Sequence, residues 1–120
     1  MSGIAAAAER CLGALTDIPD GGARGFPAAP GGLTGLFAIR RGDQVWVYVN
    51  ACPHLGTSLD WAPDKFLSVD GTLIVCGTHG AEFTIEDGEC LRGPCHGQSL
   101  EAVPVTLRDG AIWVPADAGL

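Results

Sequence analysis

The fold of this chain is decided by the stretch LFAIRRGDQVWVYVN, which occupies residues 36–50. Two apolar runs flank the turn dipeptide Gly42-Asp43, in which glycine tolerates the positive φ that tight hairpin turns require. The second run is apolar at every position from 45 to 49, which is typical of a central strand covered on both faces. The stretch therefore predicts a β-hairpin near the middle of a sheet.

Similar turn signals recur along the rest of the chain, with Asp-Gly dipeptides at 70–71, 87–88 and 109–110. We expect strands at 36–40, 44–49, 73–75, 82–85, 103–108 and 111–114. Pro104 should sit at a strand start or a sheet edge, because it has no N–H to donate. Residues 17–35, rich in Gly, Pro and Asp, should form loop with at most a short edge strand. No segment has useful helical periodicity, so the expected fold class is all-β and antiparallel.

Size and charge restrict the function. A chain of 120 residues forms one domain, and its 14 acidic against 7 basic residues make nucleic acid an unexpected partner. The acidic excess fits either a solvated surface or steering toward a basic redox partner. No apolar stretch approaches the roughly 20 residues of a membrane span, and no basic region opens the chain as in a secretory signal. We expect a cytoplasmic protein with no membrane partner, whose cysteines are reduced or metal-bound.

Two short pairs of metal-ligating residue types follow apolar runs in Gly-containing loops: Cys52 with His54, and Cys76 with His79. Zinc also binds two cysteines and two histidines, but zinc fingers typically pair like with like along the chain. Here each loop brings one of each type, which suits a binuclear cluster with both thiolates on one iron and both imidazoles on the other. A structural zinc site remains the alternative.

The two boxes, 52–56 and 76–80, resemble those of the Rieske family, which binds a [2Fe–2S] cluster. The resemblance covers roughly residues 33–115 and includes Phe83 and Gly93-Pro94, similar to the aromatic residue and the proline loop that cover the cluster. It implies an antiparallel sandwich of short strands with an inserted cluster-binding subdomain at about 50–96. We expect residues 1–10 to be a flexible N-terminus and 11–120 to be the Rieske-like domain.

By this resemblance, Cys52 and Cys76 bind the inner iron, and His54 and His79 bind the outer iron near the surface. Respiratory-type members link their two cluster loops by a disulfide, and threonines stand at both corresponding positions here, Thr57 and Thr78.

Those high-potential members also place a serine and a tyrosine hydroxyl near the cluster, where this chain has Ala81 and Phe83. Fewer hydrogen bonds to the sulfurs predict a reduction potential at the low end of the Rieske range, on the order of −150 mV. The 21 residues between His54 and Cys76 exceed the usual spacing, so an insertion at 61–68 is expected.

The resemblance implies an electron carrier that moves one electron between a reductase and a terminal acceptor such as an oxygenase. The alternative is a small Rieske subunit of a nitrite-reductase-like or oxygenase complex, and a zinc-stabilised interaction module is a further one. A complete Rieske oxygenase also needs a mononuclear iron bound by two histidines and a carboxylate. Only His96 is left for that role, so no catalytic residue is assigned and the chain is not expected to be an enzyme on its own.

Three cysteines remain outside the ligand pairs. Cys11, in a small apolar segment, is expected to be a buried hydrophobe. Cys90 and Cys95 bracket the proline loop and could pair, stay as free thiols, or join His96 in a second metal site. Trp61, just after the first box, is expected to pack against the domain, with shielding of the cluster or partner docking as alternatives.

Overall fold

The computed structural model describes residues 9–28, 34–53, 58–60, 62, 64–77, 80–93, 96–116 and 118. This part of the chain is nearly all β, as the sequence predicts, with a single short 3₁₀ turn at Leu15–Asp17. No helix within these ranges is long and apolar enough to cross a membrane. The strands are β1 Glu9–Ala14, β2 Ala23–Phe26, β3 Leu36–Arg41, β4 Gln44–Val49, β5 Leu73–Val75, β6 Glu82–Thr84, β7 Cys90–Arg92, β8 Ala102–Val103, β9 Thr106–Arg108 and β10 Ala111–Pro115.

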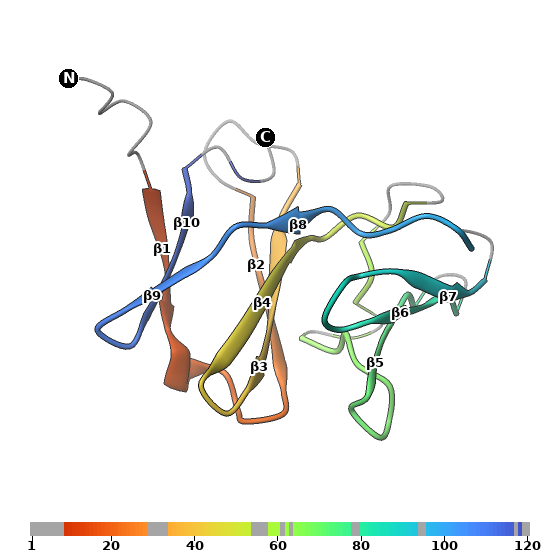
Figure 1. Ribbon diagram of the computed structural model, residues 1–120, viewed down its shortest axis with the longest axis horizontal. Coiled ribbons are helices and arrows are strands. Elements are labelled where there is room, and N and C mark those ends of the chain that lie inside the picture. The colour runs from red at the N-terminus through yellow and green to blue at the C-terminus, as the bar shows by residue number, and fades with distance from the viewer. Residues whose placement is uncertain are drawn as a thin grey trace.

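These strands form three antiparallel sheets (Figure 1). The outer sheet has the order β1-β10-β9, the central sheet β2-β3-β4-β8, and the inserted sheet β5-β6-β7. The inserted sheet is built entirely from the chain between β4 and β8, and in Figure 1 the central sheet lies between the other two. The predicted hairpin is β3–β4, which is fully paired from Leu36 opposite Val49 to Arg41 opposite Gln44.

The alternation of side chains along the central sheet creates two cores. Leu36 and Ala38 belong to a core shared with the outer sheet, whereas Phe37 and Ile39 belong to a core shared with the inserted sheet. All four side chains are at most 1% exposed. The middle strands are therefore covered on both faces, which explains the uninterrupted apolar run at 45–49 and confirms its prediction.

Tyr48 joins the inserted sheet to the central one. It is 2% exposed, and its hydroxyl donates a hydrogen bond to the carbonyl of Ile85, just after β6. The turn that follows lies directly on the ring: a Cβ on Gly88, whose φ is +68°, would come within 2.8 Å of the Tyr48 ring. Glycine is needed there both for the positive φ and for the close approach.

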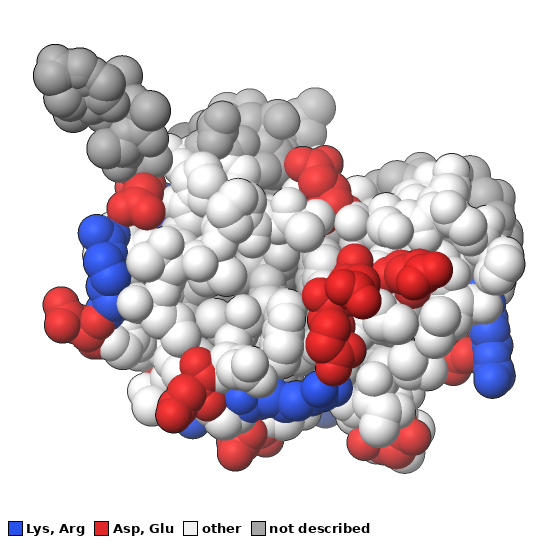
Figure 2. All heavy atoms as spheres, in the orientation of Figure 1, with Lys and Arg blue, Asp and Glu red and all other residues white. Residues whose placement is uncertain are grey.

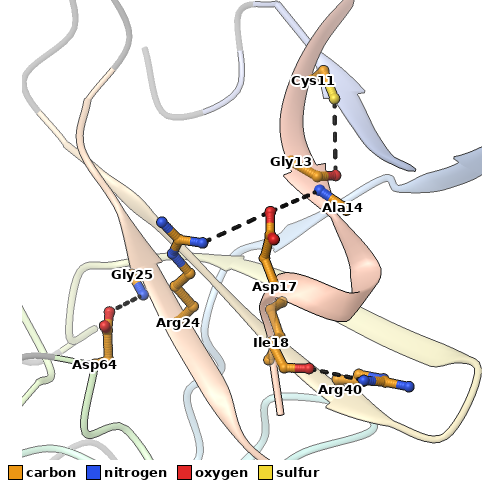
Figure 3. Close-up of polar contacts among 9 residues, drawn as sticks. All are labelled: Cys11, Gly13, Ala14, Asp17, Ile18, Arg24, Gly25, Arg40 and Asp64. Carbon is orange, nitrogen blue, oxygen red and sulfur yellow. Dashed lines mark hydrogen bonds and ion pairs between the residues drawn. The ribbon is translucent and has the colours of Figure 1, made fainter. Parts of the chain in front are cut away.

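Two further contacts connect the segment before β5 to the body of the domain. The Phe66 ring stacks on Phe37 with centroids 4.5 Å apart and an interplanar angle of 4°. The backbone N–H of Gly25, on edge strand β2, donates to the Asp64 carboxylate at 2.8 Å (Figure 3). A carboxylate on that N–H also blocks the open edge of the sheet against pairing with another chain.

Three expectations need correction. The strand expected at 103–108 is broken at Pro104 into β8 and β9, which belong to different sheets. Strands β1 and β7 were not expected. Cys11 is exposed rather than buried, because it lies opposite Trp113 on β10, on the face away from the buried neighbours Ile112 and Val114.

Candidate metal centre

The second Cys-His pair lies at the tip of the β5–β6 hairpin. The hairpin is paired up to Val75 opposite Glu82, and its six-residue tip starts at Cys76. Two short hydrogen bonds close this tip, from Cys76 N–H to the Ala81 carbonyl and from Gly80 N–H to the Cys76 carbonyl, both at 2.8 Å. Gly80 has φ +70°, a conformation that side chains rarely adopt, so the box needs glycine at this position.

The first pair starts just after β4. Asn50 N–H donates to the Gly35 carbonyl at 2.9 Å, and Ala51 N–H to the Val49 carbonyl at 2.9 Å, so the chain turns away from the sheet immediately before Cys52. It returns at Leu59, which is fully buried.

The fold brings the two cysteines of the predicted site into the same core. Cys52 is 1% exposed and Cys76 is not exposed, and both belong to the core between the central and inserted sheets. In a [2Fe–2S] cluster with mixed ligands two thiolates bind one of the irons, so two buried thiols on separate loops fit that donor set. His54 and His79 lie outside the described residues. Within the described part, no three His, Cys, Asp or Glu side chains gather as a metal site.

The two loops are also linked through backbone and side-chain hydrogen bonds that sequence reasoning missed. The Asn50 amide oxygen accepts the N–H of Leu59 at 2.8 Å, and its amide nitrogen donates to the Asp60 carboxylate at 3.2 Å. The carbonyl of Leu59 then accepts the N–H of Gly77 at 2.8 Å, next to Cys76. An asparagine two residues before a box cysteine is the sequence signal, since Asn side chains commonly close loops onto the backbone.

The segment after β7 packs tightly against the second box. A Cβ on Gly93 would lie 2.8 Å from both Cα and Cβ of Ala81, and Gly93 has φ +109°. Ala81 and Phe83 are fully buried, so no hydroxyl enters the core at these two positions. Cys90 is 2% exposed, and its sulfur lies 3.1 Å from the Arg92 carbonyl oxygen.

The remaining predictions of this region lie partly outside the described residues. His96 is exposed, and its backbone N–H donates to the Gly93 carbonyl at 3.1 Å. Trp61, Thr57, Thr78, Pro94 and Cys95 are outside the described ranges, so the roles expected for them stay predictions.

Acidic side chains dominate the turn between β6 and β7. Glu86, Asp87 and Glu89 are exposed there, and Figure 2 shows Asp and Glu side chains gathered over this part of the inserted sheet. A hydrogen bond from Arg41 at 2.8 Å lowers the pKa of Glu86. Burial, followed by the charges of Asp87 and Glu86, raises the pKa of Tyr48 to about 12. The lowered pKa keeps the Glu86 carboxylate ionised at neutral pH.

Comparisons with known proteins agree with this fold. The model of the Rieske [2Fe–2S] domain family matches residues 10–108. No curated protein matches the chain. Among solved structures, a chain of the complex of reduced oxygenase and oxidised ferredoxin in carbazole 1,9a-dioxygenase is 26% identical, with a TM-score of 0.73, covering 93% of this chain and 96% of that one.

Two further structures are similar in fold. The ferredoxin of carbazole 1,9a-dioxygenase from Nocardioides aromaticivorans IC177 is 21% identical with a TM-score of 0.73, and covers 91% of this chain and 98% of its own. The Sphingomonas yanoikuyae B1 ferredoxin is 25% identical with a TM-score of 0.70, and the match covers 89% of this chain and 97% of the ferredoxin.

Proposed function

This chain belongs to the Rieske [2Fe–2S] domain family, and on that premise we propose that it is a ferredoxin that carries one electron from a reductase to a terminal oxygenase. Its cofactor is a [2Fe–2S] cluster. The observation that carries the proposal is the burial of Cys52 and Cys76, from two separate loops, in one core of a domain with this family's pattern.

The ligands of the cluster are Cys52 and Cys76 on one iron and His54 and His79 on the other. The thiol pair is supported by its burial in one core, and the imidazole pair by its spacing from those cysteines in the two boxes. When bound, the cluster supplies reversible one-electron chemistry. The chain's own contribution is to hold the two loops together and to exclude water from the sulfur side.

The partners are redox proteins. The similar chain in the carbazole dioxygenase complex belongs to an assembly of an oxygenase with a ferredoxin, and an oxygenase is the terminal acceptor that we propose here. The exposed carboxylates of Glu86, Asp87 and Glu89, together with a net charge of −7, favour a partner with a basic face. Association should therefore slow as the salt concentration rises. We place the protein in the cytoplasm.

A reductive titration with matched cysteine variants tests this function. Purified protein should take up one electron per chain, with bleaching of its visible colour, and should be reoxidised by the terminal oxygenase of a dioxygenase system. Cys76→Ser and His79→Ala should abolish that uptake, since each removes a ligand. Cys11→Ser is the control, because Cys11 is exposed on the outer sheet and should leave electron uptake unchanged. Full electron uptake by Cys76→Ser would contradict the ligand assignment.

A further inference from the structure

A single side chain closes the base of the first ligand loop. Asn50 lies at the end of β4, and its amide oxygen accepts the N–H of Leu59 at 2.8 Å. Asn50 and Leu59, which flank the loop that contains Cys52, are therefore held together. Because Leu59 is fully buried, its N–H would have no partner without this amide.

Leu59 also contacts the second ligand loop. Its carbonyl accepts the N–H of Gly77 at 2.8 Å, directly after Cys76. The Leu59 side chain packs in the core that contains both Cys52 and Cys76. One residue thus connects the two loops, and Asn50 holds that residue by its backbone.

The chemistry of the position requires an amide. Asparagine offers an acceptor and a donor on one planar group, and here the oxygen serves Leu59 while the nitrogen donates to the Asp60 carboxylate at 3.2 Å. The donor to a carboxylate and the acceptor from a backbone N–H together fix which way the amide points. An aspartate at position 50 would instead set two carboxylates against each other.

We infer that Asn50, oriented by Asp60, is a positioning residue that holds the two ligand loops at the separation the [2Fe–2S] cluster needs and thereby slows loss of the cluster. This inference rests on the proposed ligand set. Neither side chain is a ligand, so the expected effect is on cluster retention and on the electronic state of the cluster.

The experiment measures how fast the visible absorbance of the holoprotein decays in excess chelator, together with its reduction potential and iron content. Asn50→Ala should speed the decay about tenfold, which corresponds to about 1.4 kcal/mol, and should shift the potential. Asn50→Asp should also speed it, since the donor is lost and two carboxylates meet.

Exchanging the two groups provides the rescue. The double substitution Asn50→Asp with Asp60→Asn keeps one amide, one carboxylate and the net charge, so the decay should return to within about twofold of wild type. Asp17→Ala is the control for general destabilisation. It removes a carboxylate that accepts the Ala14 N–H at 3.1 Å and lies beside Arg24, in the turn between β1 and β2 (Figure 3).

Each outcome decides something. The inference is wrong if Asn50→Ala loses its cluster at the wild-type rate with an unchanged potential, if Asp17→Ala speeds the loss equally, or if the double substitution is no better than Asn50→Asp. A wild-type protein that holds no [2Fe–2S] cluster would overturn the proposed function as well. If the wild-type protein holds its cluster and Asn50→Ala changes neither the rate of cluster loss nor the reduction potential, this inference alone is overturned.

Discussion

Deprotonation of Tyr48 should loosen the joint between the central and inserted sheets at alkaline pH. The side chain is 2% exposed, and its hydroxyl donates to the Ile85 carbonyl. Burial is the main reason that its pKa is raised from 10.0 to about 12, with Asp87 and Glu86 adding to the effect. The tyrosinate form is therefore disfavoured in the folded protein relative to the unfolded chain.

The sign and size of the effect follow from this difference. Because the folded-state pKa is the higher one, the stabilisation is fully present below about pH 10 and is lost as the pH rises toward about 12. The rise in the Tyr48 pKa from 10.0 to about 12 corresponds to roughly 3 kcal/mol of stability. At neutral pH, Tyr48→Phe should cost about 1–2 kcal/mol, since it leaves the Ile85 carbonyl without its donor.

Tyr48 is the only tyrosine in the chain, so tyrosinate absorbance in the near ultraviolet reports on this side chain alone. The assay combines that titration with denaturant unfolding of wild type and Tyr48→Phe at a series of pH values. The stability advantage of wild type over Tyr48→Phe should shrink as the pH rises above about 10 and should reverse by about pH 12. Titration near pH 10 in the folded protein, or an advantage that stays constant up to pH 12, would refute the reasoning.

Three further outcomes are expected. Gly93→Ala places a Cβ 2.8 Å from Ala81 at φ +109°, and should lower the melting temperature by about 5–10 °C. Gly97→Ala is the control, because Gly97 has a similar φ of +91° but a Cβ there would have no neighbour within 4 Å. Its melting temperature should fall less than that of Gly93→Ala, and equal falls would contradict a role for the contact with Ala81. Hydrogen bonds from the hydroxyls of Ser68 and Thr72 lower the pKa of Asp70 to about 2. The contribution of Asp70 to stability is therefore present above about pH 3.8 and is lost as the pH falls toward 2. An NMR titration of the Asp70 carboxyl with a midpoint near 3.8 would contradict this prediction. Because the buried side chains of Ala81 and Phe83 carry no hydroxyl, the reduction potential should be on the order of −150 mV. A potential above about +100 mV, measured by voltammetry, would contradict the idea that missing hydroxyls lower it.

Local signals were enough to predict the middle of the fold. The hairpin β3–β4 could be predicted because its turn and its apolar runs are adjacent in sequence. Strand β1 could not be, because Glu9–Ala14 is a strand only by virtue of its pairing with β10 about a hundred residues later. The break at Pro104 follows from a missing N–H, but only the sheets on either side show that the chain changes partner there.

For the candidate site, residue types were more informative than burial patterns. Residue type and spacing singled out Cys52 and Cys76, and the fold places both in one core; their role as ligands stays a prediction. The role of Asn50 depends on Leu59 returning beside it, which no local pattern specifies. Cys11 shows the opposite error: its apolar neighbours predicted burial, but its register opposite Trp113 turns it to the exposed face.

Electron paramagnetic resonance of the anaerobically reduced protein tests the central claim most directly, because the signal depends on which atoms bind the reducible iron. A cluster held by two cysteines and two histidines should give a mean g value distinctly below that of an all-cysteine cluster. A signal of the all-cysteine kind, or a silent and colourless protein that holds a single zinc ion, would contradict the account.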